Sequence, residues 1–213
     1  MAVSYGTVSS KQAGSGKSVS FSHTAPSGTR GILLFHFAFA ININISNVKY
    51  DNVEMTQLFN ITGFYTSLSV YLLTGSGLDG TKSITCDRDD NSVRTILSCV
   101  SVIADNDVEV DTDEAVTFSS SYGQYSEQSI NDNSPGTNSL RFAAASYRRD
   151  MGTSPGANST RIANEFTDNH VYSDICRETT AGQGSRPVGF TNTSDVYRNA
   201  VHFAVYEKAA SDT

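Results

Sequence analysis

Short apolar segments separated by polar turns run along almost the whole chain. The turns are rich in Gly, Pro, Ser and Asn, which supply the backbone conformations that tight turns need. No segment has a convincing helical period of 3.6 residues. The pattern therefore predicts an all-β protein, an antiparallel β-sandwich. The clearest apolar segments are residues 31–41, 67–73, 94–103, 140–147 and 200–206.

Two of these segments alternate as half-buried strands do. In 67–73 every second residue is Leu or Val, and in 200–206 Val and Phe share one face. Residues 32–41 are instead apolar on both faces, so we expect a central strand whose second face is covered by a loop or by another subunit. His36 lies in this segment. We interpret it as a hydrogen-bonded core residue rather than a ligand.

The N-terminal segment is polar, so we expect the chain to consist of an arm or edge strand (1–16) and a sandwich domain (17–213). Small polar residues in the first segment bury little area, so we expect it to become ordered only against a neighbouring chain. A run of six carboxylates over 105–114 predicts a solvated, mobile face. The stretch 119–128 has no apolar period that would indicate a strand.

The chain has 213 residues and a formal net charge of −7, with 15 Lys+Arg and 22 Asp+Glu. This length suits one large sandwich domain. A negative surface repels phosphate backbones and argues against nucleic acid as a partner. We find no signal peptide and no apolar run of the roughly 20 residues that span a bilayer. We therefore expect synthesis in a reducing cytoplasm, or delivery outside by a route other than secretion, and no membrane partner.

Three cysteines are an odd number without the spacing of a metal site. We expect Cys86, Cys99 and Cys176 to be small buried or half-buried strand residues, and no disulfide to be needed for stability.

No catalytic constellation is evident, and we expect no enzyme activity and no cofactor. His170 and Cys176 are the one tempting nucleophile–base pair, but six residues of extended chain would keep them apart. The many acids permit a glycosidase pair, but spacing alone cannot pair them.

Two ligand sites remain open alternatives. Oxygen ligands at Asp87, Asp89 and Asp90 suit Ca²⁺, although Asp and Asn between two strands are better interpreted as turn formers. Sugar binding commonly uses exposed aromatic rings. The chain has no Trp, and the tyrosines in or beside polar segments could stack on a sugar or could cap the core. These tyrosines are Tyr122, Tyr125, Tyr147 and Tyr172.

Residues 47–56 read Asn-Val-Lys-Tyr-Asp-Asn-Val-Glu-Met-Thr, follow an apolar strand and precede Ser-Val-Tyr-Leu-Leu (69–73). This order resembles a jelly-roll β-sandwich module of bacteriophage virion proteins and bacterial surface proteins. The module often has Gly-Gly where this chain has Asp51-Asn52, which also suits a tight hairpin. The resemblance covers residues 20 to 206 and implies a single jelly-roll-like sandwich without catalytic residues.

The whole-chain pattern is most similar to that of phage capsid decoration (cement) proteins. The resemblance implies a homotrimer on the outside of the virion that contacts the major capsid protein and stabilises the shell. A carbohydrate-binding adhesin of a phage tail or bacterial surface is the second hypothesis, and a polysaccharide-cleaving sandwich enzyme is the third. The host, the oligomer number and the docking surface do not follow from the sequence.

Overall fold

The computed structural model describes residues 3–14, 16–39, 43–90, 94–124, 126–131, 139–148, 153–167, 171–179, 182, 184–192 and 195–208. Regular secondary structure in these residues is entirely β-structure, so the all-β prediction is confirmed. They contain no helix of the length and hydrophobicity needed to cross a membrane. The strands are β1 (Ser4–Ala13), β2 (Ser18–Ala25), β3 (Thr29–Ala38), β4 (Ile45–Tyr50), β5 (Val53–Glu54), β6 (Thr56–Thr62), β7 (Ser67–Thr74), β8 (Gly80–Arg88), β9 (Thr95–Ile103), β10 (Val108–Gly123), β11 (Gln128–Ile130), β12 (Ser139–Tyr147), β13 (Ser154–Pro155), β14 (Ser159–Thr167), β15 (Val171–Glu178), β16 (Arg186–Val188), β17 (Phe190–Thr191) and β18 (Val196–Glu207).

The first half of the chain has the strand order of a jelly roll. One sheet has five strands in the order β1-β9-β3-β7-β6, and the other has four in the order β2-β8-β4-β5. The first strand thus pairs with the last, and the second strand with the next to last, as in a jelly roll. β4 and β5 are joined by Asp51 and Asn52, which have φ values of 52° and 66°. Two successive positive φ values suit a tight two-residue hairpin turn, so that prediction is confirmed.

The second half repeats this strand order. Its five-stranded sheet runs β10-β18-β12-β15-β14, in which β10 takes the place of β1, β18 of β9, β12 of β3, β15 of β7 and β14 of β6. The second sheet of this half is reduced to two short ribbons, β11–β16 and β13–β17. The sequence shows no clean repeat, whereas the topology contains two jelly-roll units in tandem.

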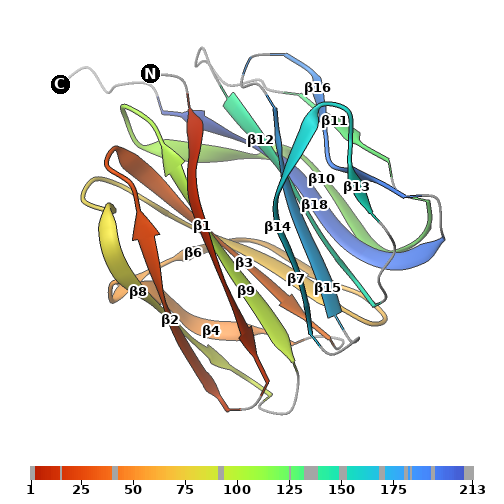
Figure 1. The fold of residues 1–213 in the computed structure, drawn as a ribbon, viewed down its shortest axis with the longest axis horizontal. Coiled ribbons are helices and arrows are strands. Elements are labelled where there is room, and N and C mark those ends of the chain that lie inside the picture. The colour runs from red at the N-terminus through yellow and green to blue at the C-terminus, as the bar shows by residue number, and fades with distance from the viewer. Residues whose placement is uncertain are drawn as a thin grey trace.

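Four layers result, and the two five-stranded sheets are the inner ones (Figure 1). This arrangement explains why residues 32–38 of β3 are apolar on both faces. Leu33 and Phe35 of β3 pack against the second five-stranded sheet, whereas Ile32 and Leu34 pack against the four-stranded sheet. The expectation that a loop or another subunit covers this strand is therefore wrong, because the second half of the same chain covers it.

Aromatic rings fill the space between the two inner sheets. Phe203 of β18 lies 6.2 Å from Phe35, 5.4 Å from Phe59 and 5.9 Å from Phe142, measured between ring centroids. Phe35 and Phe59 belong to the first half of the chain and Phe142 to the second. Burial of one such ring contributes about 1.5–3 kcal/mol, so this shared core binds the two halves together.

The N-terminal segment is an edge strand. β1 pairs antiparallel with β9, from Ser4 opposite Ile103 to Ala13 opposite Thr95. Its partner belongs to the same chain, so the expectation that this segment becomes ordered only against a neighbouring chain is wrong. The division at residue 16 stays a prediction.

The acidic run is also a strand. β10 extends over 16 residues and pairs with β18, although its first half carries most of the acidic run. The run 105–114 is mostly exposed or half-buried, as a solvated face should be, but most of it lies in a strand. The strand continues to Gly123, although the sequence of 119–128 has no apolar period that indicates one. Lys208 neutralises part of this charge through an ion pair of 2.8 Å with Glu109, and Tyr206 donates a hydrogen bond to the same carboxylate.

The three cysteines are free and buried in strands, as expected. Cys86 and Cys99 pack between the first two layers, and Cys176 packs under the short ribbons of the second half.

Candidate functional site

Loops from both halves of the chain meet at one end of the molecule. The β6–β7 loop of the first half contains Thr66, which contacts strands of the second half. Ser146 donates a hydrogen bond of 2.9 Å to the Thr66 hydroxyl, and the Asn199 amide donates one of 3.0 Å to the same oxygen. All three residues are buried. These bonds fix the β6–β7 loop against β12 and β18, so that its neighbouring side chains are held in place at the surface.

Four aromatic side chains form a connected cluster at this end. Tyr197 lies at its centre, with ring centroids 6.2 Å from Phe64, 5.4 Å from Tyr65 and 4.8 Å from Tyr122. The rings are exposed by 65% (Phe64), 38% (Tyr65), 62% (Tyr122) and 41% (Tyr197). They come from the β6–β7 loop, from the end of β10 and from the start of β18. We call these four residues the aromatic cluster.

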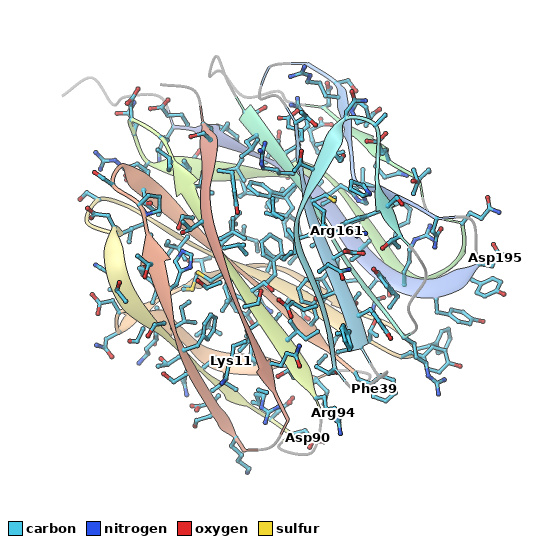
Figure 2. The ribbon with its side chains drawn as sticks, in the orientation of Figure 1. Lys11, Phe39, Asp90, Arg94, Arg161 and Asp195 are labelled. Carbon is cyan, nitrogen blue, oxygen red and sulfur yellow. The ribbon has the colours of Figure 1, made fainter. Side chains whose placement is uncertain are left out.

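Arg148 extends the cluster toward the β3–β4 loop. Its guanidinium carbon lies 5.0 Å from the ring centroid of Tyr65 and 5.9 Å from that of Phe39, within the range of cation–π attraction. Figure 2 labels Phe39 and Asp195, which lie on the two sides of this end of the molecule. The surface therefore combines apolar ring faces, phenol hydroxyl groups and one cation.

The cluster is unusual on this molecule. Six large hydrophobic side chains are exposed among the described residues, and four of them belong to the aromatic cluster. Isolated exposed hydrophobic residues are normal, but a contiguous patch marks a binding surface. Tyr, Phe and Arg are the residue types enriched in such surfaces. The arrangement can stack on or dock against a partner, and it needs no titratable group to do so.

A second aromatic row lies near the same end. Tyr147, Tyr172 and Phe166 stack in sequence, with centroid distances of 6.0 Å and 5.7 Å and interplanar angles of 4° and 19°. Only Phe166 is strongly exposed, whereas Tyr147 is buried. The row therefore presents one ring to a partner and uses the other two for packing.

The four tyrosines singled out from the sequence lie in different places. Tyr122 is part of the aromatic cluster, whereas Tyr147 and Tyr172 belong to the stacked row. Tyr125 lies outside the described residues. Sequence reasoning missed Phe64, Tyr65 and Tyr197. The available signal for the first two was their position directly after Gly63 and before the apolar segment 67–73, where a connection between strands would expose them.

A buried carboxylate lies beside the stacked row. Asp174 forms an ion pair of 2.9 Å with Arg161 and accepts a hydrogen bond of 2.6 Å from Asn164. Hydroxyl groups of Tyr147 and Thr153 also donate to it. Burial raises the pKa of Asp174, and the donors and the Arg161 charge oppose this shift. Its oxygens are committed to neighbours on β12, on β14 and in the loop that contains Thr153, so we assign it a structural role.

Two carboxylates of the acidic segment 87–90 accept hydrogen bonds from neighbouring residues. Asp87 accepts from Ser18 (2.6 Å) and Asn47 (2.8 Å), and these bonds lower its pKa. Asp89 accepts a bond of 3.2 Å from the backbone N–H of Asn44. Asp90 ends the described part of this turn. Within the described part of the chain, no three His, Cys, Asp or Glu side chains gather as metal ligands. These contacts favour the turn interpretation over a Ca²⁺ site.

The pair of His170 and Cys176, which the sequence argues against as base and nucleophile, has only one member among the described residues. His170 lies outside them, and Cys176 is completely buried, which raises the pKa of its thiol. A buried, protonated thiol is a poor nucleophile.

The other three histidines are completely buried. His23 lies between Ser9 and Ser101, with ring nitrogen to hydroxyl distances of 3.0 Å and 2.6 Å. His36 is buried as expected, but neither of its ring nitrogens has a hydrogen-bond partner. Expectation and structure therefore differ at His36, which is a core residue without the predicted hydrogen bond.

Comparisons with protein-family models, with curated proteins and with solved structures found no match for this chain. The resemblance to phage decoration proteins therefore stays a prediction. The function has to be argued from the surface of the molecule.

Proposed function

We propose that this protein is a structural virion protein that decorates a phage capsid and contacts the major capsid protein through the aromatic cluster. The cluster is the observation that carries the proposal, because it places most of the exposed large hydrophobic side chains of the described residues on one end. The resemblance of residues 20 to 206 to virion jelly rolls supplies the partner. In this proposal the protein is made in the host cytoplasm and acts on the outside of the virion.

The composition of the cluster suits protein docking. The four rings are 38–65% exposed, so burying each of them on binding contributes about half of the ~1.5–3 kcal/mol that a fully exposed side chain would gain. A few central aromatic and Arg residues commonly provide most of the affinity of an interface. The remaining surface is polar and acidic, with a formal charge of −7 for the chain, which keeps a densely displayed protein soluble.

Self-association as a homotrimer is part of the proposal, but only one of its two grounds remains. The apolar second face of β3 no longer supports it, because the chain covers that face itself. The trimer therefore rests on the resemblance alone. Light scattering of the purified chain tests it directly: a mass of three chains supports the trimer, and a monomer at high concentration removes it from the proposal.

Capsid occupancy of a substituted protein tests the docking surface. The variant combines Phe64→Ser, Tyr122→Ser and Tyr197→Ser, each at an exposed position. Val53→Ser is the matched control, because Val53 is exposed by a similar fraction but lies on β5 of the outer sheet. We expect the triple variant to lose at least about tenfold in capsid affinity and the control to bind normally. Equal occupancy of both variants would refute the docking role.

A carbohydrate-binding adhesin is the second candidate, and the exposed tyrosines favour it. Aromatic rings stack on the apolar faces of sugar rings, and phenol hydroxyl groups can donate hydrogen bonds to sugar oxygens. A glycan array separates the two candidates. Binding of a neutral glycan by the native chain and its loss in the triple variant would support the adhesin. A blank array together with capsid binding would support the decoration protein.

A further inference from the structure

The aromatic cluster is accompanied by a cation whose hydrogen-bond donors are unused. Arg148 directly follows β12 and is exposed. Its guanidinium contacts the rings of Tyr65 and Phe39, at 5.0 Å and 5.9 Å from the ring centroids. Among the described residues it forms no ion pair and donates no hydrogen bond. All its N–H groups are therefore available to a partner.

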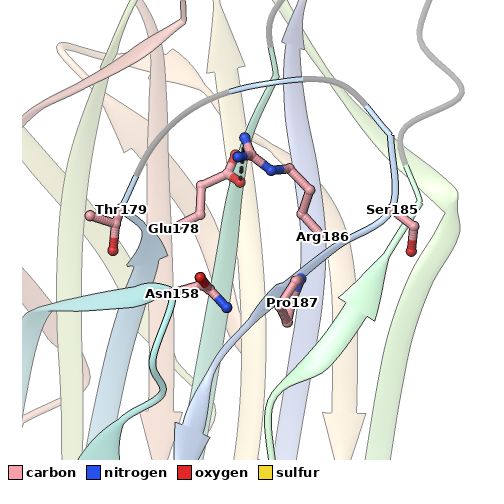
Figure 3. Close-up of a pocket in the computed structure, with 6 residues that line it drawn as sticks. All are labelled: Asn158, Glu178, Thr179, Ser185, Arg186 and Pro187. Carbon is pink, nitrogen blue, oxygen red and sulfur yellow. Dashed lines mark ion pairs between the residues drawn. The ribbon is translucent and has the colours of Figure 1, made fainter.

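Most other arginines of the described residues are already engaged with the chain itself. In the pocket beside β16, the guanidinium of Arg186 lies 3.8 Å from the carboxylate of Glu178 (Figure 3). That pocket contains one cation and one anion, so it offers no net charge to a ligand. Arginines that form hydrogen bonds or ion pairs with oxygen atoms of this chain are Arg88, Arg141, Arg161, Arg177, Arg186 and Arg198. Arg148 differs from all of these.

The rings hold this guanidinium in place before any partner arrives. Tyr65 packs against Tyr197, with ring centroids 5.4 Å apart. The next residue, Thr66, is buried and accepts hydrogen bonds from β12 and β18. Phe39 directly follows β3, so Arg148 of the second half rests on two rings of the first half. A group that is already positioned loses little conformational freedom when it binds.

We propose that the capsid segment that docks on the aromatic cluster presents an Asp or Glu side chain to Arg148. This inference rests on the proposed docking role and names the chemistry of the partner. A planar guanidinium matches the two oxygens of a carboxylate, and such a pair strengthens when docking excludes water. The chain has a net charge of −7, so most of its surface repels an acidic partner. Arg148 would therefore determine which end of the molecule docks.

The ring geometry favours a protein segment over an acidic sugar chain. The planes of Phe64, Tyr65 and Tyr122 are inclined to that of Tyr197 by 75°, 61° and 47°. A sugar chain needs an open ring face on which it can lie flat. Rings that are inclined to one another instead offer edges and faces to an apolar side chain that packs between them. Aromatic residues together with Arg are also the usual anchors of protein interfaces.

Binding to phage shells depleted of this protein tests the inference. We expect Arg148→Gln to weaken the affinity about tenfold or more. Arg148→Lys keeps the charge without the planar fork and should lose less. Arg30→Gln is the matched control, because it makes the same charge change near the start of β3, about 30 Å along the strand from Phe39. The control should bind normally, and melting curves show whether each variant is folded.

Chemical modification of the shell tests the partner's side of the contact. Carbodiimide and glycinamide convert exposed carboxylates of the shell into neutral amides. Binding of the native chain should then fall to the level of Arg148→Gln, whose own binding should change little. Added salt should likewise weaken the native chain more than Arg148→Gln, because the lost contact is partly Coulombic.

The triple variant Phe64→Ser, Tyr122→Ser and Tyr197→Ser separates this inference from the docking role. If that variant binds shells as the native chain does, both proposals fail. If it loses binding while folded Arg148→Gln binds as tightly as Arg30→Gln, the docking role stands and the inference about Arg148 is wrong. Native binding that survives amidation of the shell would also overturn the inference. Binding that is lost after periodate oxidation of sugars, but not after amidation, would replace the protein segment with a glycan.

Discussion

Buried histidines make the stability of this protein sensitive to acid. Burial lowers the pKa of His23 to about 4 and those of His36 and His202 to about 3, from an ordinary value of 6.5. Between pH 6.5 and pH 4 the unfolded chain therefore takes up protons that the folded chain refuses. Stability from these residues is complete above pH 6.5 and is lost as the pH falls through this window, by up to about 1.4 kcal/mol per pH unit for each histidine.

His36→Leu tests this account at one residue. The two ring nitrogens have no hydrogen-bond partner, so an apolar side chain of similar size should fold at least as well at pH 7. The variant should also lose less stability than the native protein between pH 6.5 and pH 4.5. Urea unfolding at a series of pH values measures both effects. Burial raises the pKa of Asp174 and Glu178, so these two groups favour the folded state as the pH falls. Both the native protein and the His36→Leu variant contain them, so they do not affect the comparison.

A control and a contradicting result complete that experiment. His23→Leu breaks two hydrogen bonds to serine and should destabilise the protein at pH 7. Identical pH dependence of the native protein and His36→Leu would show that His36 does not resist protonation.

Single residues of the candidate site were only partly predictable. The sequence indicates that Tyr122 lies in a polar segment, and it is exposed in the structure. It gives no sign that Tyr197, 75 residues away, lies against it. Contacts between segments so far apart depend on the packing of the two halves, which no local pattern contains.

Strands with plain alternation were predictable, whereas β10 was not. The segments at 67–73 and 200–206 are confirmed as β7 and β18. β10 pairs with β18 through two register shifts, between Asp111 and Val116 and between Phe118 and Ser121. Each irregularity changes the face on which the next residues lie, so the period of two disappears from the sequence. Because β10 lies at the edge of its sheet, its carboxylates can also remain in water.

Deletion of residues 2–15 tests the assignment of β1 as an intrinsic strand. The deletion removes the backbone partner of β9 and the contact between Ser9 and His23. We expect the melting temperature to fall by more than about 5 °C, which in a protein of this length corresponds to a loss of roughly 1–3 kcal/mol. Lys11→Ala, at an exposed position of the same strand, should leave it unchanged. A truncated protein with the native melting temperature would contradict the assignment.

The tandem jelly rolls share one core, and this sharing is invisible in the sequence. The two halves share a strand order, but the outer sheet of the second half is reduced to two short ribbons. The sequence shows no clean repeat between the halves. The sandwich itself was predictable from alternation and turns. The pairing of two sandwiches was not, because a two-faced apolar strand can be covered by any apolar surface.

A shared core predicts that the two halves unfold together. Phe203→Ala in the second half should cost about 3–5 kcal/mol and lower a single transition. It should also speed hydrogen exchange in β3, because Phe203 contacts Phe35 of the first half. Calorimetry and amide exchange measure the two effects. Two separate melting transitions, only one of them moved by the substitution, would contradict the shared core.

The central claim is that this chain decorates a capsid through the end that contains the aromatic cluster. Cryo-electron microscopy of the purified phage particle tests it most directly. We expect density for the tandem jelly roll on the outside of the shell, with Phe64, Tyr122 and Tyr197 buried against the major capsid protein. A shell without this density, or a bound chain whose aromatic cluster faces the solvent, would contradict the claim.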